Sequence, residues 1–591
     1  MTAERLEALR QALRQQGVHG FVLQRTDQHG SEYLPPSEER LAWLTGFTGS
    51  AGQAVVLDDA AAVFTDGRYT VQIGQEVAGS LFERCNSAEQ PANKWLESRL
   101  RPEMVVGYDP KLTRKAERQS LQRLCRNRGA ELRALDANPI DALWQDRPAP
   151  PAAPVVAHDV QYAGEASVDK RRRIGEEVGK AGADWLLVTA ADSIAWLLNV
   201  RGSDVPYNPL CLSHLLLAAD GRARWFVDAA KLADGPVVDD GVEIRAYEAL
   251  DAGLDEVGAA GARVLVDPAA NAVAFADRLD RAGARVIEAT DPIPLAKAKK
   301  NLLEIEGALA AQRRDGAAIV RFLTWLDQQP HDGSITERDA AAHLHEERAR
   351  HPFFRGPSFE TISAHGPNSA LPHYRVSETS NRPLTAGTLY LVDSGGQYLD
   401  GTTDITRTIA LGQPSAEMSL RFTLVLKGHI ALSEAVFPEG TAGSQLDILA
   451  RQFLWRRGLD YDHGTGHGIG SYLCVHEGPQ RLAKRGGDAA LTPGMILSNE
   501  PGYYRPGSYG IRIENLVLIE SAAMPEEGER PLLCFRNLTL APIDRRLIDV
   551  HHLTEPERRW LDAYHARVLE ELAPLLDRTC KAWLEQATAP L

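Results

Sequence analysis

Acidic residues at the ends of apolar segments are the first feature of this 591-residue chain that could carry chemistry. The apolar run 389–392 ends on Asp393, a Gly-containing turn follows, and a second β-prone run opens on Asp404. This pattern predicts a β-hairpin. A turn centred on Tyr398 and Leu399 would place the two acids opposite each other on one face, whereas the Asp-Gly pair that follows favours a wider or bulged loop.

Two carboxylates on one sheet face repel each other, and burial strengthens the repulsion. Such a hairpin therefore needs a cation between the two acids, or a proton on one of them. A solvated acidic hairpin is the alternative when Asp393 and Asp404 are considered without the rest of the chain.

Histidines follow in a Gly-rich segment, where His463 and His467 are four residues apart among four glycines. So many glycines disfavour a helix and indicate close approach of the backbone to a site. His476 follows nine residues after His467. A histidine in such a loop is a better ligand candidate than one on an apolar helix face.

Two further acids lie in apolar, β-prone segments. The run 495–498 leads to Glu500, and Glu514 lies between Ile513 and Leu516. A charged residue in such a run is either outward on an alternating strand or buried and paired. For Glu514 considered alone, the outward position is the better fit.

Together, the four acids and one histidine predict a site for two divalent cations. Two such ions neutralise four carboxylates, whose clustering would otherwise cost more than a fold can spare. Oxygen ligands with a single imidazole favour Mn²⁺ or a similar ion over a thiolate-type zinc site. Paired ions can lower the pKa of a shared water and polarise a carbonyl, so the predicted chemistry is hydrolysis.

The composition predicts a globular, cytoplasmic protein of several domains. At ~150 residues per domain, the length predicts three to four. Hydrophobic residues make up 44% of the chain and charged residues 25%, and the net charge of -15 argues against nucleic acid or anionic membrane as partners. The amino terminus lacks the apolar core of a signal peptide, and no apolar run reaches ~18 residues. Six scattered cysteines without C-x-x-C spacing indicate reduced thiols.

One order of predicted elements occurs twice before residue 300. Each copy has a helix, a buried strand, a segment containing Ala-Trp-Leu and two more strands, which supports an internal duplication. Chance similarity between two α/β units is the alternative. The predicted segments are 4–16, 18–23, 41–47, 54–57 and 62–65 in the first copy, and 169–180, 184–189, 194–200, 214–218 and 224–228 in the second.

Proline-rich breaks separate the copies from each other and from the C-terminal half of the chain. The Pro/Ala stretch 147–154 predicts a stiff, extended linker, and a second break lies at 291–294. A long amphipathic helix is predicted at 302–326, and one or two closing helices from Thr554 onward.

These residues closely resemble the pita-bread metallopeptidases, and within them the long, three-domain, cytosolic type of Xaa-Pro aminopeptidase (aminopeptidase P) in family M24B. The resemblance covers nearly the whole chain, and all five ligand positions are filled. The motifs that carry it, besides the five ligands, are 361–368, 372–374, 426–431, 463–479 and 500–504.

The resemblance implies an α/β (α+β) fold in three domains: two creatinase-like N-terminal domains at 1–150 and 151–298, and a pita-bread catalytic domain with C-terminal helices at 299–591. It implies two divalent ions, with Mn²⁺ expected ahead of Zn²⁺ or Co²⁺. Asp393 should bind the first ion, Asp404 and Glu514 should bridge both, and His467 and Glu500 should complete the second.

The family's activity is release of the first residue from peptides whose second residue is proline, by attack of a hydroxide held between the two ions. Glu500 is the candidate for moving the proton. His373 and His476 are expected to hydrogen-bond the scissile carbonyl, and His463 to line the proline pocket. Arg512 and Tyr504 are expected to hold metal ligands in place.

A homodimer is also implied. Three rival assignments fit less well. Methionine aminopeptidase lacks the two leading domains, and prolidase normally has only one. Relatives that only bind proteins lose metal ligands, whereas all five are present here.

Overall fold

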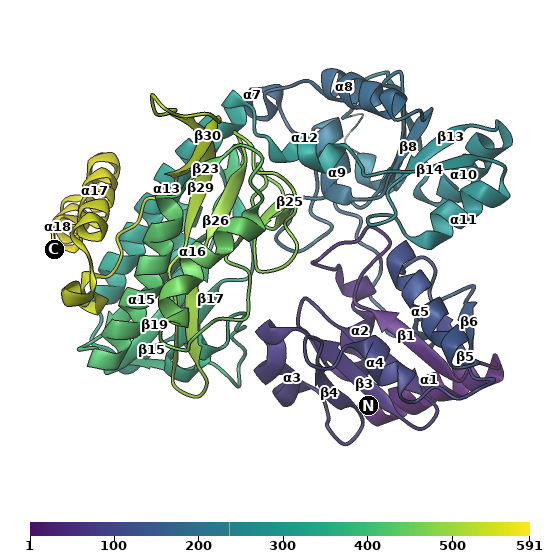
Figure 1. Cartoon of the computed structure of the whole chain (residues 1–591), viewed down its shortest axis with the longest axis horizontal. Helices are drawn as coiled ribbons and strands as arrows, with labels where there is room; N and C mark the ends of the chain where they lie inside the picture. The colour runs from purple at the N-terminus through teal and green to yellow at the C-terminus, as the bar shows by residue number, and fades with distance from the viewer. Residues whose placement is uncertain (234, 236) are drawn as a thin grey trace. The chain divides into compact units, whose positions relative to one another are not determined.

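The computed structural model of the protein describes residues 1–233, 235 and 237–591, and these divide into two compact units (Figure 1). The first unit comprises Met1–Asp159 and Glu165–Ile293. The second comprises Val160–Gly164 and Pro294–Leu591. In the part of the chain that is described, no helix combines the length and apolarity needed to cross a lipid bilayer.

The first half of unit one is built on a six-stranded sheet with order β4-β3-β2-β1-β5-β6. Side chains of β1 alternate between two cores, because Phe21 and Leu23 join one cluster and Val22 joins the other. Leu6, Leu9 and Leu13 lie on one face of the first helix and pack into the former core. The elements are α1 (Thr2–Gln15), β1 (Gly20–Gln24), α2 (Arg40–Thr45), β2 (Gln53–Leu57), β3 (Ala61–Thr65), α3 (Thr70–Glu76), β4 (Glu83–Asn86), α4 (Ala92–Glu97), β5 (Val105–Tyr108), α5 (Lys115–Asn127), β6 (Glu131–Ala134) and α6 (Pro139–Leu143).

The second half of unit one repeats this sheet, with order β12-β11-β10-β8-β13-β14. Strand directions also match, because the central strand in each sheet pairs antiparallel on one side and parallel on the other. The predicted recurrence of one α/β unit is therefore confirmed. Its elements are α8 (Ser167–Lys180), β8 (Trp185–Val188), α9 (Ala191–Leu198), β10 (His214–Ala218), β11 (Ala223–Phe226), β12 (Val242–Arg245), α10 (Leu250–Ala259), β13 (Arg263–Val266), α11 (Val273–Arg281) and β14 (Arg285–Glu288).

Unit two combines a six-stranded sheet, of order β23-β30-β29-β26-β24-β25, with the three-stranded sheet β17-β19-β22. The long predicted helix is present as α13 (Leu302–Asp327). Further helices are α12 (Ile293–Ala298), α14 (Glu337–Ala349), α15 (Ala416–Ser433) and α16 (Gly443–Trp455). The strands are β17 (Ile362–His365), β19 (Thr388–Ser394), β22 (Ile405–Leu411), β23 (Val436–Pro438), β24 (Gly466–Gly468), β25 (Glu477–Leu482), β26 (Ile496–Asn499), β29 (Asn515–Ala522) and β30 (Leu532–Asn537), with the hairpin β27 (Gly502–Arg505) and β28 (Tyr509–Arg512).

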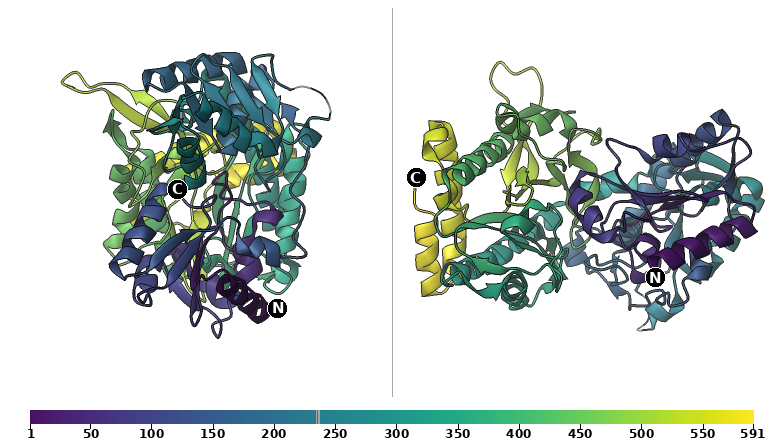
Figure 2. Two further views of the ribbon diagram at one scale, coloured as in Figure 1. Left: turned by 90° about the vertical axis from the view of Figure 1, so that its right-hand side faces the viewer. Right: turned by 90° about the horizontal axis from the view of Figure 1, so that it is seen from below.

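Two closing helices, α17 (Glu555–Leu572) and α18 (Arg578–Ala587), pack along one side of unit two and are drawn in yellow near the C-terminus (Figure 2). Leu561, Leu572 and Leu584 are fully buried and share a core with Val320 of α13 and Val425 of α15. The predicted C-terminal helices are therefore confirmed.

The acidic hairpin is formed by β19 and β22, extended by the short strands β20 (Gly396–Tyr398) and β21 (Gly401–Thr402). Asp393 is paired with Thr406 rather than with Asp404, so the turn is centred one residue beyond the position that would place the acids directly opposite. The two acids are diagonal neighbours on the same face, because alternate residues of a strand share a face.

Candidate metal centre

Three of the predicted ligands converge at one point of unit two. Ligand atoms of Asp404, His467 and Glu514 all lie within 4.8 Å of one another. They come from the residue just before β22, the middle of β24 and the connection between β28 and β29. Glu500, which directly follows β26, completes a group of four, with Oε1 at 3.7 Å from Nε2 of His467.

Asp393 joins this group through Arg512. The Nη2 of Arg512 donates to Asp393 Oδ2 at 2.5 Å, and its Nε donates to Thr406 Oγ1 at 3.1 Å. Thr406 in turn donates to Glu514 Oε2 at 2.7 Å. Arg512 therefore contacts a predicted ligand directly, as expected, and Thr406 connects Arg512 to Glu514 in a way that its position in the sequence did not indicate.

Burial of Glu514 corrects the expectation for this residue considered alone. Its side chain is only 2% exposed, so the outward-facing alternative is wrong. The solvated-hairpin alternative is wrong for the same reason, because Asp393 and Asp404 are buried as well.

The glycines of the His463–Gly470 segment allow β24 to lie against its neighbours. A Cβ on Gly466 would lie 2.0 Å from the carbonyl oxygen of Ser498, and one on Gly468 would lie 2.5 Å from that of Glu477. The expectation of close backbone approach is confirmed. This packing places His467 of β24 between β26, which ends just before Glu500, and β25, which begins just after His476.

The tautomer of His467 suits a metal ligand. Its Nδ1–H donates to the carbonyl of Gly468 at 3.0 Å, which leaves the Nε2 lone pair facing Asp404 Oδ2 at 3.4 Å. A lone pair opposite a carboxylate is repulsive unless a cation or a proton lies between them.

The electrostatics of the cluster favour added positive charge. Burial, followed by repulsion from neighbouring carboxylates, raises the pKa values of Asp404 and Glu514 well above their ordinary range. Burial raises the pKa of Glu500 to about 6, although His467 and Arg512 oppose the shift. The raised pKa values mean that burial disfavours the ionised carboxylates, and a bound cation would offset that cost.

The donor set fits divalent cations. Oδ1 of Asp393 and Oδ1 of Asp404 are buried, and neither has a hydrogen-bond partner among the described residues. Buried oxygens of this kind are normally satisfied, so two unsatisfied ones beside an imidazole lone pair indicate a place for ions. Hard oxygen donors with one nitrogen match Mn²⁺ and related ions.

Two other predicted histidines lie at this cluster. The Nδ1–H of His463 donates to the carbonyl of Gly464 at 2.7 Å, so its Nε2 accepts from the hydroxyl of Tyr504 at 2.8 Å. Tyr504 also accepts a hydrogen bond from Arg512. The ring of His476 lies edge-on to His467, with 4.3 Å between centroids.

His373 is located through the residues on either side of it. The carbonyl of Pro372 accepts from Nη2 of Arg512 at 3.2 Å, which brings this loop to the guanidinium that also binds Asp393. The hydroxyl of Tyr374 points to a separate buried carboxylate, that of Glu337.

A buried ion triad beside His476 was not predicted from the sequence. Glu477 is fully buried and binds Nζ of Lys297 at 2.6 Å and Nζ of Lys300 at 2.5 Å. Both lysines are also almost fully buried. A local signal is the pair of lysines near the start of unit two, but their partner lies about 180 residues away.

Substituting Glu477→Gln should destabilise unit two strongly. Two buried ammonium groups would lose their counter-charge, which typically costs about 3–5 kcal/mol. The measurement is the urea midpoint of unfolding. Glu520→Gln is the matched control, since its ion pair with Arg536 is exposed and should contribute less than about 1 kcal/mol. Equal midpoints for both variants would contradict the stabilising role of the triad.

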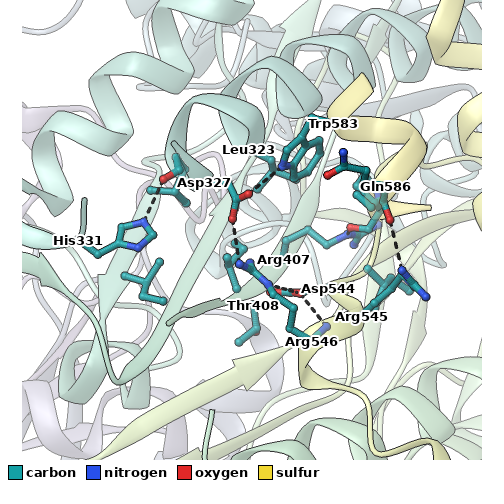
Figure 3. Close-up of a pocket in the computed structure, with 16 residues that line it drawn as sticks. Leu323, Asp327, His331, Arg407, Thr408, Asp544, Arg545, Arg546, Trp583 and Gln586 are labelled. Atoms are coloured by element: carbon teal, nitrogen blue, oxygen red, sulfur yellow. Dashed lines mark hydrogen bonds and ion pairs between the residues drawn. The ribbon is translucent and has the colours of Figure 1, made fainter. Parts of the chain in front are cut away.

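A cavity of unit two lies elsewhere, between α13, β22 and α18, with a volume of about 190 Å³ (Figure 3). Its ionic groups bind one another: Arg546 pairs with Asp327 at 2.9 Å and with Asp544 at 2.8 Å. The indole of Trp583 donates to Asp327 at 3.1 Å. His331 lines this cavity, but none of the predicted metal ligands or site histidines does, so it is not the candidate site.

Within this α/β fold, the buried cluster of carboxylates with an imidazole indicates a metal-binding site of the kind that metal-dependent enzymes use. Family comparisons agree. Residues 306–521 match metallopeptidase family M24, residues 5–143 and 146–304 match creatinase/prolidase N-terminal domains, and residues 531–591 match the C-terminal region of peptidase M24. The chain belongs to metallopeptidase family M24.

Individual relatives align over the full chain. It is 39% identical to the probable Xaa-Pro aminopeptidase P of Laccaria bicolor, over 100% of this chain and 94% of the relative. It is also 39% identical to aminopeptidase P2 of Arabidopsis thaliana, over 100% of this chain and 88% of that one.

A solved structure agrees with these relatives. It is an X-prolyl aminopeptidase from Caenorhabditis elegans, described as a cytosolic enzyme with a di-nuclear active site. It matches at 35% identity with a TM-score of 0.94 and covers 100% of both chains. The expected α/β fold, with two creatinase-like domains before a pita-bread catalytic domain, is confirmed.

Proposed function

We propose that this enzyme hydrolyses the first peptide bond of peptides with proline at the second position and releases the first residue. The observation that carries the proposal is the convergence of Asp404, His467 and Glu514, next to Glu500, in a chain that aligns end to end with relatives named for this activity. The two creatinase-like domains further support it over a dipeptidase with one such domain.

We assign two divalent ions, preferably Mn²⁺, to the five ligands. Asp393 would bind the first ion, Asp404 and Glu514 both, and His467 and Glu500 the second. Once bound, such ions supply Lewis-acid activation of a water molecule and of the substrate carbonyl. The unsatisfied oxygens of Asp393 and Asp404 support this assignment.

The surrounding side chains would handle protons and orient the peptide. Glu500, with a pKa of about 6, is suited to accept a proton from the attacking water and pass it to the leaving proline nitrogen. His373 and His476 would hydrogen-bond the carbonyl oxygen as charge develops on it. His463, fixed by Tyr504, would line a pocket for the proline ring.

We also propose a homodimeric, cytoplasmic protein with domain boundaries near residues 150 and 298. The family matches at 5–143 and 146–304 support these boundaries. The description of the Caenorhabditis elegans relative as cytosolic supports the location.

Product analysis by mass spectrometry on Arg-Pro-Pro and Arg-Ala-Pro tests the proposed function. The protein is stripped with a chelator and assayed with and without added Mn²⁺. Release of arginine from Arg-Pro-Pro alone, and only with metal, is the expected result. Cleavage of both peptides would remove the proline pocket from the account, and cleavage of neither by the metal-loaded protein would overturn the proposed function.

Substituting His373→Ala should lower kcat on Arg-Pro-Pro by about 10²–10³-fold, because a hydrogen bond to the developing oxyanion is lost. Metal content measured by elemental analysis should not change. His551→Ala, at an exposed histidine, is the control and should keep full activity. Loss of metal in His373→Ala would mean that His373 is a ligand instead.

A further inference from the structure

Glu337 is a buried carboxylate outside the proposed ligand set. It is the first residue of α14 and is fully buried. Burying a carboxylate costs several kcal/mol unless hydrogen bonds compensate for the lost water. Burial raises the pKa of Glu337, and hydrogen bonds from its neighbours oppose that shift.

The compensating hydrogen bonds come from one loop segment, residues 365–382. Oε1 accepts from the backbone N–H of His365 at 2.6 Å and from Nδ2 of Asn368 at 3.0 Å. Oε2 accepts from the hydroxyl of Tyr374 at 2.8 Å and from the backbone N–H of Arg382 at 2.9 Å. Both oxygens are therefore used, and the helix N-terminus also favours the negative charge.

This segment carries His373. Residues 371–382 are all described, and none of the residues 371–381 belongs to a helix or a strand. Its shape therefore depends on side-chain anchors. Arg512 binds the carbonyl of Pro372 at 3.2 Å and Glu337 binds Tyr374, while Arg375 beyond them pairs with Glu360 at 3.3 Å. His373 lies between Pro372 and Tyr374.

We propose that Glu337 is a positioning residue for the hydrolytic reaction, because its carboxylate holds the loop so that the imidazole of His373 reaches the substrate carbonyl. The inference rests on the proposed role of His373. Misplacement of a catalytic group by about 1 Å can cost about 10²-fold in rate, so a carboxylate remote from the ions can have a large effect on turnover.

Glu337→Gln is the main test, because glutamine has nearly the same volume as glutamate. Its NH₂ group would face hydrogen-bond donors that in the wild type are bound by a carboxylate oxygen. We expect kcat on Arg-Pro-Pro to fall by about 10- to 100-fold, with KM and metal content per chain little changed. A purely structural role would lower the folded fraction but leave kcat per metal-loaded molecule unchanged.

Coupling to His373 is the decisive readout. In a His373→Ala background, Glu337→Gln should lower kcat by less than about twofold, because both substitutions remove the same interaction. Glu347→Gln is the matched control. Glu347 is a buried acid on the same helix that pairs with Arg321 at 3.0 Å and Arg350 at 2.8 Å, and its substitution should leave kcat unchanged.

The outcomes separate this inference from the proposed function. An inactive, metal-loaded wild type overturns the proposed function and this inference with it. An active wild type with impaired His373→Ala, but with wild-type kcat in Glu337→Gln or multiplicative loss in the double variant, overturns the role of Glu337 alone. If Glu337→Gln does not fold, Tyr374→Phe removes one of the same hydrogen bonds. It should lower kcat several-fold in the wild-type background and not in His373→Ala.

Discussion

Replacing Asp404 with asparagine is expected to lower turnover on Arg-Pro-Pro by at least about 10³-fold, equivalent to about 4 kcal/mol of transition-state stabilisation. Asp404 is 3% exposed and has a ligand oxygen 3.4 Å from Nε2 of His467. Asparagine keeps the size of the side chain but removes the charge that two cations require. Metal bound per chain, measured by elemental analysis after dialysis, should fall together with activity.

The same substitution should stabilise the metal-free protein. Burial and the neighbouring Asp393 raise the pKa of Asp404 well above its usual range, so the ionised carboxylate is unfavourable when no cation is present. Loss of activity together with equal or greater stability in chelator would separate a ligand role from general damage to the fold.

Asp400→Asn is the matched control for Asp404→Asn. Asp400 is also a buried acid, lies at the turn of the same hairpin and pairs with Arg314, away from the carboxylate cluster. Its substitution should leave metal binding and kcat within a few-fold of the wild type. Full activity in Asp404→Asn would contradict the two-metal account.

Removing the metal is expected to abolish activity and to lower the unfolding temperature by an amount that grows with pH. Folding raises the pKa values of Asp404, Glu500 and Glu514, in the case of Glu500 to about 6. Between the ordinary carboxyl pKa near 4 and these raised values, the folded state binds more protons than the unfolded state. The contribution of these groups to the free energy of unfolding therefore falls as pH rises.

The measurement is thermal unfolding of metal-loaded and chelator-treated protein at pH 5, 6, 7 and 8. Below about pH 5 the acids bind protons and compete with the metal, so the gap between the two forms should be small. At pH 8 the metal-free cluster holds fewer protons and its carboxylates repel one another more strongly, so the gap should be largest. Asp404→Asn should reduce the gap at every pH, and a gap that narrows as pH rises would contradict the account.

The convergence of Asp404, His467, Glu500 and Glu514 was predictable from the sequence because each predicted acidic ligand ends or interrupts an apolar segment. Asp393, Asp404 and Glu500 follow or open strands whose hydrophobic pattern is visible without a structure. Glu514 was misjudged when considered alone, since nothing in its neighbours distinguishes a buried acid from an exposed one. Only the complete set indicated that a cation would compensate for its burial.

The register of the β19–β22 hairpin and the distant partners of the buried acids could not be predicted in the same way. The one-residue difference in the turn of the β19–β22 hairpin depends on how Leu399 and Asp400 are accommodated between short strands. The contacts of Glu477 with Lys297 and of Glu337 with Tyr374 join segments that are 180 and 37 residues apart. No local pattern marks such pairs, because the residues on either side of a Glu do not reveal whether its side chain is solvated or buried against a distant partner.

The number of ions needed for activity tests the central claim most directly. Chelator-stripped protein is titrated with Mn²⁺ while hydrolysis of Arg-Pro-Pro and metal bound per chain are followed together. The five-ligand site predicts that activity reaches its maximum when two ions are bound, with His467→Ala weakening the second. Full activity at one bound ion per chain, unaffected by further metal, would contradict the two-metal site.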